Sequence, residues 1–171
     1  MIQGTSLKTL LLGWGNPDRQ DDGAAWHVLA EVARRSGLPV PEEEGEAFAP
    51  LGSSLDLLFA LQLNPEFSEI VAGYDRVAFI DAHTGSVAND LNIRTLDPIF
   101  QTSPLTHHFT PESCLELTRQ LYGANPEAWL VSVRGYQFGF SHEMSAPTAA
   151  LAQQAASALI TWIDTGSLSA S

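Results

Sequence analysis

An apolar run that ends in two closely spaced glycines constrains the fold of this chain more than any other feature. Residues 8–13 are mostly apolar, Gly13 and Gly15 stand at their end, and a turn then leads to the adjacent carboxylates of Asp21 and Asp22. The run predicts a buried strand, and the glycines predict a tight turn behind it. Asp21 and Asp22 are therefore expected at the exit of a buried strand, where open α/β sheets bind their ligands.

The rest of the chain alternates between strand and helix patterns. Short apolar runs predict strands, and apolar residues at helical spacing behind Ser, Asn or Thr capping residues predict helices. The predicted strands cover 8–13, 76–81, 128–133 and, more weakly, 91–96 and 46–48; the predicted helices cover 22–36, 53–61, 64–72, 110–122 and 147–163.

This alternation indicates the fold class. Strands that alternate with helices pair in parallel through crossovers, which place helices on both faces of the sheet. We therefore expect an α/β fold with a three-layer, open, twisted and mostly parallel sheet that leaves room for one antiparallel edge strand. No linker divides the 171 residues, so we expect a single domain over 1–171. Within it, 39–50 carries four glutamates between prolines and is predicted to be an acidic, insertion-like, solvated loop.

Charge and composition exclude several classes of partner. The net charge is −12, which makes nucleic acids and anionic membranes unfavourable partners. The charge serves either solubility alone or the attraction of a protein with a basic tail or rim. The apolar runs are too short to cross a bilayer, and no basic stretch precedes an apolar core at the N-terminus. Cys114 is the only cysteine, which fits a reducing cytoplasm.

The paired carboxylates indicate a cation or a hydrogen-bond donor. Capping a helix and compensating its dipole needs only one carboxylate and is worth about 0.5–2 kcal/mol. Asp21 and Asp22 repel each other, so the second carboxylate needs a further partner. Asp81 ends the buried strand over 76–81, at the same expected edge of the sheet. It could cap the next segment or take part in a site there.

Two histidines complete a candidate metal site. His107 and His108 precede the helix that starts at Thr110. In a parallel sheet, this loop can meet the loops that carry the two aspartates at one edge. Two carboxylates and one neutral imidazole suit Zn, Ni or a similar divalent ion, and three protein ligands leave a coordination position open. His83, two residues past Asp81, could be a further ligand or hydrogen-bond to one.

Common enzyme signatures are absent. Gly13-x-Gly15 lacks the third glycine of a dinucleotide-binding turn, and Asp18 would repel a pyrophosphate, so we expect no nucleotide cofactor. The chain contains neither Gly-x-Ser-x-Gly nor His-Glu-x-x-His, which excludes the usual serine and zinc hydrolase motifs.

A series of motifs, in order along the chain, resembles the hydrogenase maturation proteases, which trim the C-terminal extension from the large subunit of nickel–iron hydrogenases. Between 39 and 62 the chain departs from this family, because the acidic loop replaces an Asp-Gly-Gly-Thr segment. This departure bears on which substrate is cut more than on the activity itself. The similar motifs are Gly13-Trp14-Gly15-Asn16, Asp21-Asp22-Gly23, Gln62-Leu63-Asn64-Pro65-Glu66, Val77-Ala78-Phe79-Ile80-Asp81-Ala82, Thr106-His107-His108-Phe109-Thr110-Pro111-Glu112 and the segment over 135–147.

The resemblance implies a function and a site. It implies an aspartic-type endopeptidase, a hydrolase that activates a hydrogenase by cutting the large-subunit precursor in the cytoplasm after nickel insertion. Asp22, Asp81 and His107 match the catalytic and metal-contacting side chains of the family; spacing to Pro111 favours His107, with His108 as the alternative. Nickel would be supplied by the substrate, although the ligands could bind another divalent ion such as Zn or Cd in vitro. Asp21 could orient a water molecule or cap the helix.

One alternative function remains open at this level. A non-proteolytic assembly factor or chaperone could bind the same metal-loaded precursor through the same ligands without cutting it.

Overall fold

Five strands form one sheet, in the order β2-β1-β3-β5-β4. The structure is a computed structural model that describes residues 6–100 and 109–170. β1 pairs in parallel with β2 and β3, β3 pairs in parallel with β5, and β4 pairs antiparallel with β5. The mostly parallel sheet with one antiparallel edge strand is thus confirmed. The strands are β1 (Thr9–Trp14), β2 (Leu55–Ala60), β3 (Arg76–His83), β4 (Leu91–Thr95) and β5 (Glu127–Arg134).

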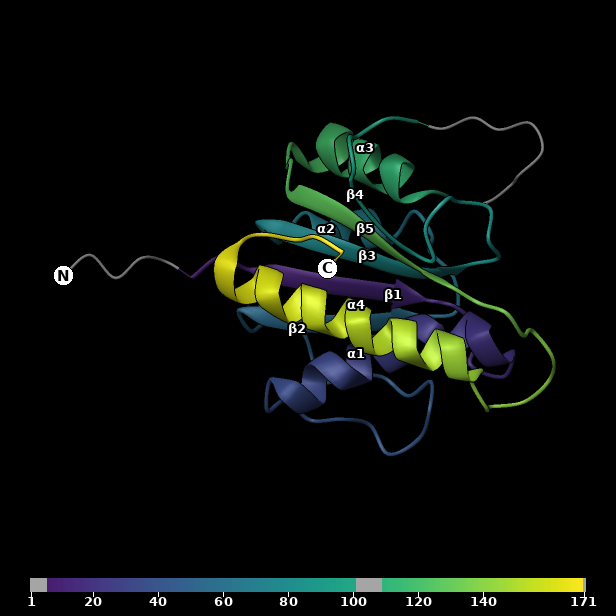
Figure 1. Cartoon of the computed structure of the whole chain (residues 1–171). Coiled ribbons are helices and arrows are strands. Elements are labelled where there is room, and N and C mark those ends of the chain that lie inside the picture. The colour runs from purple at the N-terminus through teal and green to yellow at the C-terminus, as the bar shows by residue number, and fades with distance from the viewer. Residues whose placement is uncertain (1–5, 101–108, 171) are drawn as a thin grey trace.

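Helices cover both faces of the sheet (Figure 1). Leu11 and Ile80 pack in one core with α1 and α4, whereas Leu10 and Phe79 pack in a second core with α2 and α3. Because successive strand residues point to opposite faces, each buried strand supplies both cores, and its sequence is continuously apolar. The helical elements are the 3-10 turn η1 (Gln20–Gly23), α1 (Ala24–Arg35), α2 (Phe67–Val71), α3 (Pro111–Tyr122) and α4 (Ala146–Thr165).

The helix predicted over 53–61 is wrong, because these residues form the edge strand β2. Leu55, Leu57 and Phe59 contribute to the core beneath α1 and α4, whereas Leu58 packs on the opposite face. A run of apolar residues this short fits both helical and strand spacing, and the parallel pairing with β1 decides between them. Asp56 lies on this strand and accepts hydrogen bonds from the Tyr74 hydroxyl and two loop N–H groups.

The acidic loop over 39–50 forms no strand at 46–48, so that prediction is also wrong. Side chains of α1 attach the loop to the body of the protein. The indole N–H of Trp26 donates to the carbonyl of Glu46 at 3.1 Å, and Nε2 of His27 lies 2.7 Å from Oε1 of Glu44. The loop is therefore held against α1, although most of its side chains are exposed.

The other predicted elements form with small shifts at their ends. The helix expected over 22–36 starts as η1 and becomes α-helical at Ala24. α3 begins as expected, because Thr110 Oγ1 accepts a hydrogen bond from the Ser113 N–H at 3.1 Å. None of the described helices combines the length and the apolar character that crossing a bilayer requires.

Gly15 allows the end of β1 to approach the Asp22 turn closely. Its φ of +148° disfavours any residue with a side chain, and a Cβ built on it would lie 2.0 Å from the carbonyl oxygen of Asp22. Gly13 serves a related purpose, because a Cβ there would lie 3.1 Å from the side chains of Ala25 and Leu29 in α1. The glycine pair is thus explained by packing.

We predict that Gly15→Ala destabilises the protein by at least about 2 kcal/mol, since it adds both backbone strain and a steric overlap that must push Asp22 away. Gly73→Ala is the matched control, because its Cβ would meet only the carbonyl of Ile70, at 3.4 Å. Urea unfolding of both variants measures the difference. Equal stability of the two variants would contradict this account of Gly15.

Candidate functional site

A cleft of about 700 Å³ opens at the carboxyl ends of β1, β2 and β3. This is the edge at which parallel α/β sheets bind ligands, and Asp22 and Asp81 both line the cleft. Most of the other lining residues are of apolar types, with two neutral amide side chains and one threonine hydroxyl among them. These residues are Trp14, Gly15, Leu61, Gln62, Leu63, Asn64, Pro65, Ala82, Phe109, Thr110 and Pro111.

Asp22 is held in the cleft from two sides. Its Oδ2 accepts a hydrogen bond from the backbone N–H of Asn16 at 2.9 Å, just after β1. Its own backbone lies against Gly15, as described above. The carboxylate is half-buried, so both the strand end and η1 determine its position.

Asp81 carries a buried oxygen with no hydrogen-bond partner among the described residues, namely Oδ1. Burial raises the pKa of this carboxyl group to about 6, and the negative charges of Glu112 and Asp22 contribute in the same direction. A hydrogen bond from Ser132 and the positive charge of Arg94 act against this increase. A buried carboxylate oxygen without a partner among the described residues costs stability, which makes Asp81 a candidate for binding a ligand.

The two carboxylates therefore form a candidate cation site. They share one cleft and are close enough to repel each other, and a divalent cation between them would relieve that repulsion. No group of three or more His, Cys, Asp or Glu side chains within 6–100 and 109–170 is arranged to hold a metal ion. The expected third ligand, His107 or its alternative His108, lies outside the described residues; the described chain resumes at Phe109, which lines the cleft.

Asp21 is directed away from the cleft and has a different environment from Asp22. Its side chain is fully buried and accepts five hydrogen bonds. Burial opposes its ionisation, but the hydrogen bonds outweigh this effect and hold the pKa of Asp21 below its ordinary value. Asp21 thus joins η1 to the segment that enters α4. The five donors are the N–H groups of Tyr136, Gln137 and Ser145 and the hydroxyls of Ser145 and Thr148.

His83 supports the turn that follows β3. It is buried, its Nδ1 accepts from the N–H of Gly85 at 3.1 Å, and its Nε2 lies 3.1 Å from the carbonyl of Asp90. With Nδ1 accepting, Nε2 carries the proton and donates to that carbonyl. Both ring nitrogens of His83 are therefore engaged by the backbone.

Sequence reasoning missed the ion pair beside Asp81. Arg94 on β4 donates to Oε1 of Glu112 on α3 at 2.7 Å, and Glu112 is buried. The two residues lie 18 positions apart, on β4 and on α3, so no local pattern reveals the pair. Sequence reasoning also missed the apolar wall that Trp14 and Leu61 form. Trp14 directly follows the first predicted strand, at the carboxyl edge of the sheet, and that position is the signal that could have revealed the wall.

Comparisons with known proteins give a fold but no sequence family. No protein-family model matches the chain, and no curated protein matches it. Solved structures do match over almost the whole chain. They include the [NiFe] hydrogenase maturation protease HycI from Thermococcus kodakarensis KOD1, with 19% identity, 94% of each chain covered and a TM-score of 0.62.

Two further structures agree with it. The hydrogenase maturating endopeptidase HybD from E. coli has 14% identity, 95% coverage of each chain and a TM-score of 0.67. The [NiFe] hydrogenase maturation protease HybD from Thermococcus kodakarensis has 17% identity, covers 92% of this chain and 99% of its own, and has a TM-score of 0.65. At these identities the likeness establishes that this chain has the fold of solved hydrogenase maturation proteases.

We predict that Asp21→Asn lowers the free energy of unfolding by roughly 2–4 kcal/mol at pH 7. The NH2 group of asparagine is a donor in place of one acceptor oxygen, so it cannot accept the hydrogen bonds that this oxygen of Asp21 accepts. Since the pKa of Asp21 is lowered by folding, its ionised form stabilises the wild type above about pH 4, and this contribution is lost as the pH falls through the lowered pKa. Urea unfolding at pH 7 and pH 3 should therefore show a smaller difference at pH 3. Asp97→Asn, at an exposed position, is the control and should change stability by less than about 0.5 kcal/mol.

We predict the opposite effect for Asp81→Asn. Because folding raises the pKa of Asp81 from 3.8 to about 6, its ionisation costs stability; this cost is absent below pH 3.8, grows between pH 3.8 and about 6, and is complete above about pH 6. The neutral amide should stabilise the protein by roughly 1–3 kcal/mol at pH 8 and have little effect near pH 4. A variant less stable than wild type at pH 8 would show that Asp81 already has a partner in the free protein.

Proposed function

We propose that this chain is an endopeptidase that removes the C-terminal extension of a nickel–iron hydrogenase large-subunit precursor after nickel insertion. The observation that carries the proposal is the unpaired, buried Oδ1 of Asp81 in one cleft with Asp22. The fold supports it, because solved structures with this fold include hydrogenase maturation proteases. The proposed compartment is the cytoplasm, in keeping with the buried free thiol of Cys114.

In this proposal the metal arrives as part of the substrate. Asp22, Asp81 and His107 bind the nickel of the precursor at its open coordination positions, with carboxylate oxygens and an imidazole nitrogen. A precursor without nickel lacks this contribution to binding, so it is not held in the cleft. The same ligands could take up Zn or Cd alone in vitro, because divalent ions of this class accept the same donors.

The two carboxylates have separate tasks during recognition. Asp22 is fixed by the N–H of Asn16, so it can bind the ion without moving. Asp81 exchanges an unpaired buried oxygen for a metal contact, and so relieves the electrostatic cost that raises its pKa. Once the nickel is bound, the scissile carbonyl or a water molecule next to the metal can be activated by it.

The apolar wall of the cleft suits the polypeptide on either side of the bond to be cut. Trp14 and Leu61 offer apolar contact area, and the side chain of Gln62 offers both a donor and an acceptor to a peptide backbone. Among the described residues, Asp22 and Asp81 are the only charged side chains that line the cleft. An extended, uncharged stretch of chain therefore fits it.

Trimming of a purified large-subunit precursor tests the proposal. We expect the wild type to shorten the nickel-loaded precursor and to leave the nickel-free precursor intact, as measured by intact-protein mass spectrometry. Asp22→Ala and Asp81→Ala should each slow trimming by at least about 100-fold, since each removes a contact to the metal. Asp164→Ala is the control, because Asp164 is exposed near the end of α4 and lies outside this cleft. Trimming at the wild-type rate by both cleft variants would refute the assignment.

The same assay separates the two remaining candidates. His107→Ala should abolish trimming, whereas His108→Ala should retain it; the reverse result would make His108 the ligand. A wild-type protein that binds the nickel-loaded precursor tightly and never shortens it would support the non-proteolytic assembly factor or chaperone instead.

A further inference from the structure

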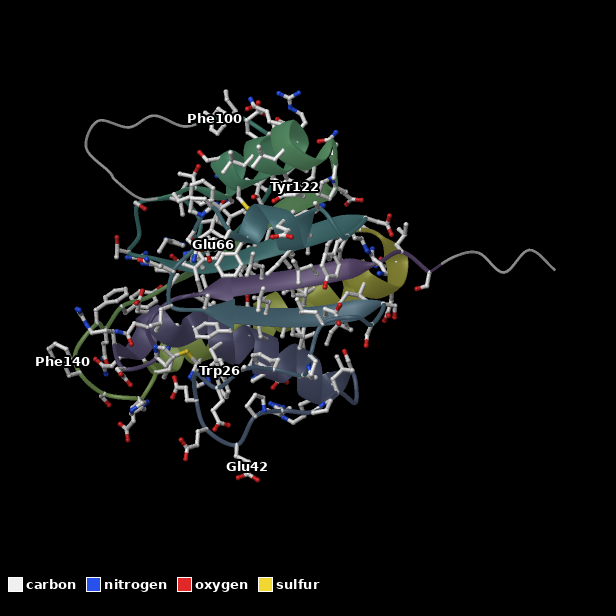
Figure 2. The ribbon with its side chains drawn as sticks, turned by 180° about the vertical axis from the view of Figure 1, so that it is seen from behind. Trp26, Glu42, Glu66, Phe100, Tyr122 and Phe140 are labelled. Atoms are coloured by element: carbon white, nitrogen blue, oxygen red, sulfur yellow. The ribbon has the colours of Figure 1, made fainter. Side chains whose placement is uncertain are left out.

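The segment over 135–145, here called the arm, presents a phenylalanine almost entirely to solvent. Phe140 is 91% exposed, the largest value among the exposed large apolar residues of the described chain. Burying a phenylalanine is worth roughly 1.5–3 kcal/mol, so this position forgoes a large stabilising contribution. Figure 2 shows Phe140 at the outer end of the arm, pointing away from the body of the protein.

The arm is not a loose loop, because hydrogen bonds attach it to the turn that carries Asp22. The Asp21 carboxylate accepts from two N–H groups at the start of the arm and from Ser145 at its end. Next to the tip, the N–H of Gly139 donates to Oε1 of Gln20 at 2.8 Å. The Arg19 guanidinium donates twice to the carbonyl of Phe138, at 3.0 and 3.1 Å.

The aromatic ring of Phe140 is itself held in place. The guanidinium carbon of Arg19 lies 5.1 Å from the centroid of the ring, a cation–π contact. On the other side of the tip, the backbones of Arg19 and Ser141 form a β-bridge. An exposed aromatic residue that is fixed before binding loses little conformational entropy when it docks, and Arg and aromatic residues are enriched among the residues that dominate binding energy.

We infer that Phe140 is a docking anchor that inserts into an apolar pocket on the folded body of the precursor. This inference rests on the proposed function. The arm is bonded to residues 18–21, and Asp22 follows directly, so a protein that brings its metal to Asp22 also meets the arm. Phe140 and the carboxyl ends of the strands lie at the same end of the molecule (Figure 2).

Charge favours a foreign partner over a second copy of this chain. Asp18 and Glu143 are exposed on the two segments that hold the tip. The net charge of the chain is −12, so two copies meeting at their arms would bring like charges together. The expected partner surface is therefore an apolar pocket with lysine or arginine residues at its rim.

Single-turnover trimming of the nickel-loaded precursor over a range of enzyme concentrations tests this anchor. We expect Phe140→Ala to raise the half-saturating concentration at least 10-fold and to leave the maximal rate unchanged, because docking is weakened and the cleft is intact. Phe140→Trp should restore most of the affinity. Tyr122→Ala is the matched control, since Tyr122 is an exposed aromatic residue on α3 and Figure 2 places it far from the arm. It should change neither quantity.

Each other outcome has a defined meaning. An unchanged half-saturating concentration for Phe140→Ala overturns the anchor and leaves the proposed function standing. A reduced maximal rate with unchanged affinity also overturns it, because the arm would then act on the cleft. A wild type that dimerises in sedimentation velocity, when Phe140→Ala does not, assigns the residue to self-association instead.

Failure of the proposed function gives a distinct result. If the wild type binds the precursor without shortening it, the titration is repeated with binding as the readout, and a 10-fold weaker Kd for Phe140→Ala still supports the anchor. If the wild type neither binds nor shortens the precursor, both the function and the anchor are overturned.

Discussion

The buried carboxylate of Asp21 connects parts of the chain that are far apart in sequence and sets the geometry around the cleft. Its donors include the N–H groups of Tyr136 and Ser145, which lie 115 and 124 residues further along the chain. Each bond to an ionised acceptor is stronger than a neutral one, and here five of them converge on one side chain. Through Asp21, the entry to α4 and the arm are fixed to η1, and η1 determines where Asp22 lies.

Asp21 and Asp81 thus meet opposite requirements. Asp21 is buried and fully satisfied, so its charge stabilises the fold, as its lowered pKa indicates. Asp81 is the reverse case, because its buried Oδ1 has no partner among the described residues and its pKa is raised. A side chain that costs stability in the free protein and lies in a cleft is better explained by a ligand than by the fold.

Local pattern predicted the buried parts of this structure well and the edges poorly. β1 and β3 are continuous apolar runs that pack on both faces, so their sequences favour strands strongly. β2 was mistaken for a helix because its apolar residues suit both spacings, and only its pairing with β1 distinguishes them. The carboxyl edge of the sheet could be expected from the alternation of elements, and with it the shared cleft of Asp22 and Asp81.

The sequence alone could not assign different roles to neighbouring side chains such as Asp21 and Asp22. Nothing local separates Asp21 from Asp22, since the donors that bury the first come from the far end of the chain. The ion pair of Arg94 and Glu112 likewise joins β4 to α3 across the intervening loop. The exposure of Phe140 depends on how the arm is held, because in sequence it is one aromatic residue of a glycine-rich loop.

In the function proposed above, an incomplete metal site would explain why an anchor outside the cleft is useful. If the cleft bound free divalent ions tightly, an ion from solution would occupy it and compete with the metal of the precursor. Two carboxylates supply only part of a coordination sphere, so a free ion would bind them weakly and the discrimination between loaded and unloaded precursor would be kept. Weak binding in the cleft then has to be compensated elsewhere. A rigid aromatic residue attached to the Asp22 turn can supply affinity to the folded client, whereas only the cleft senses the metal.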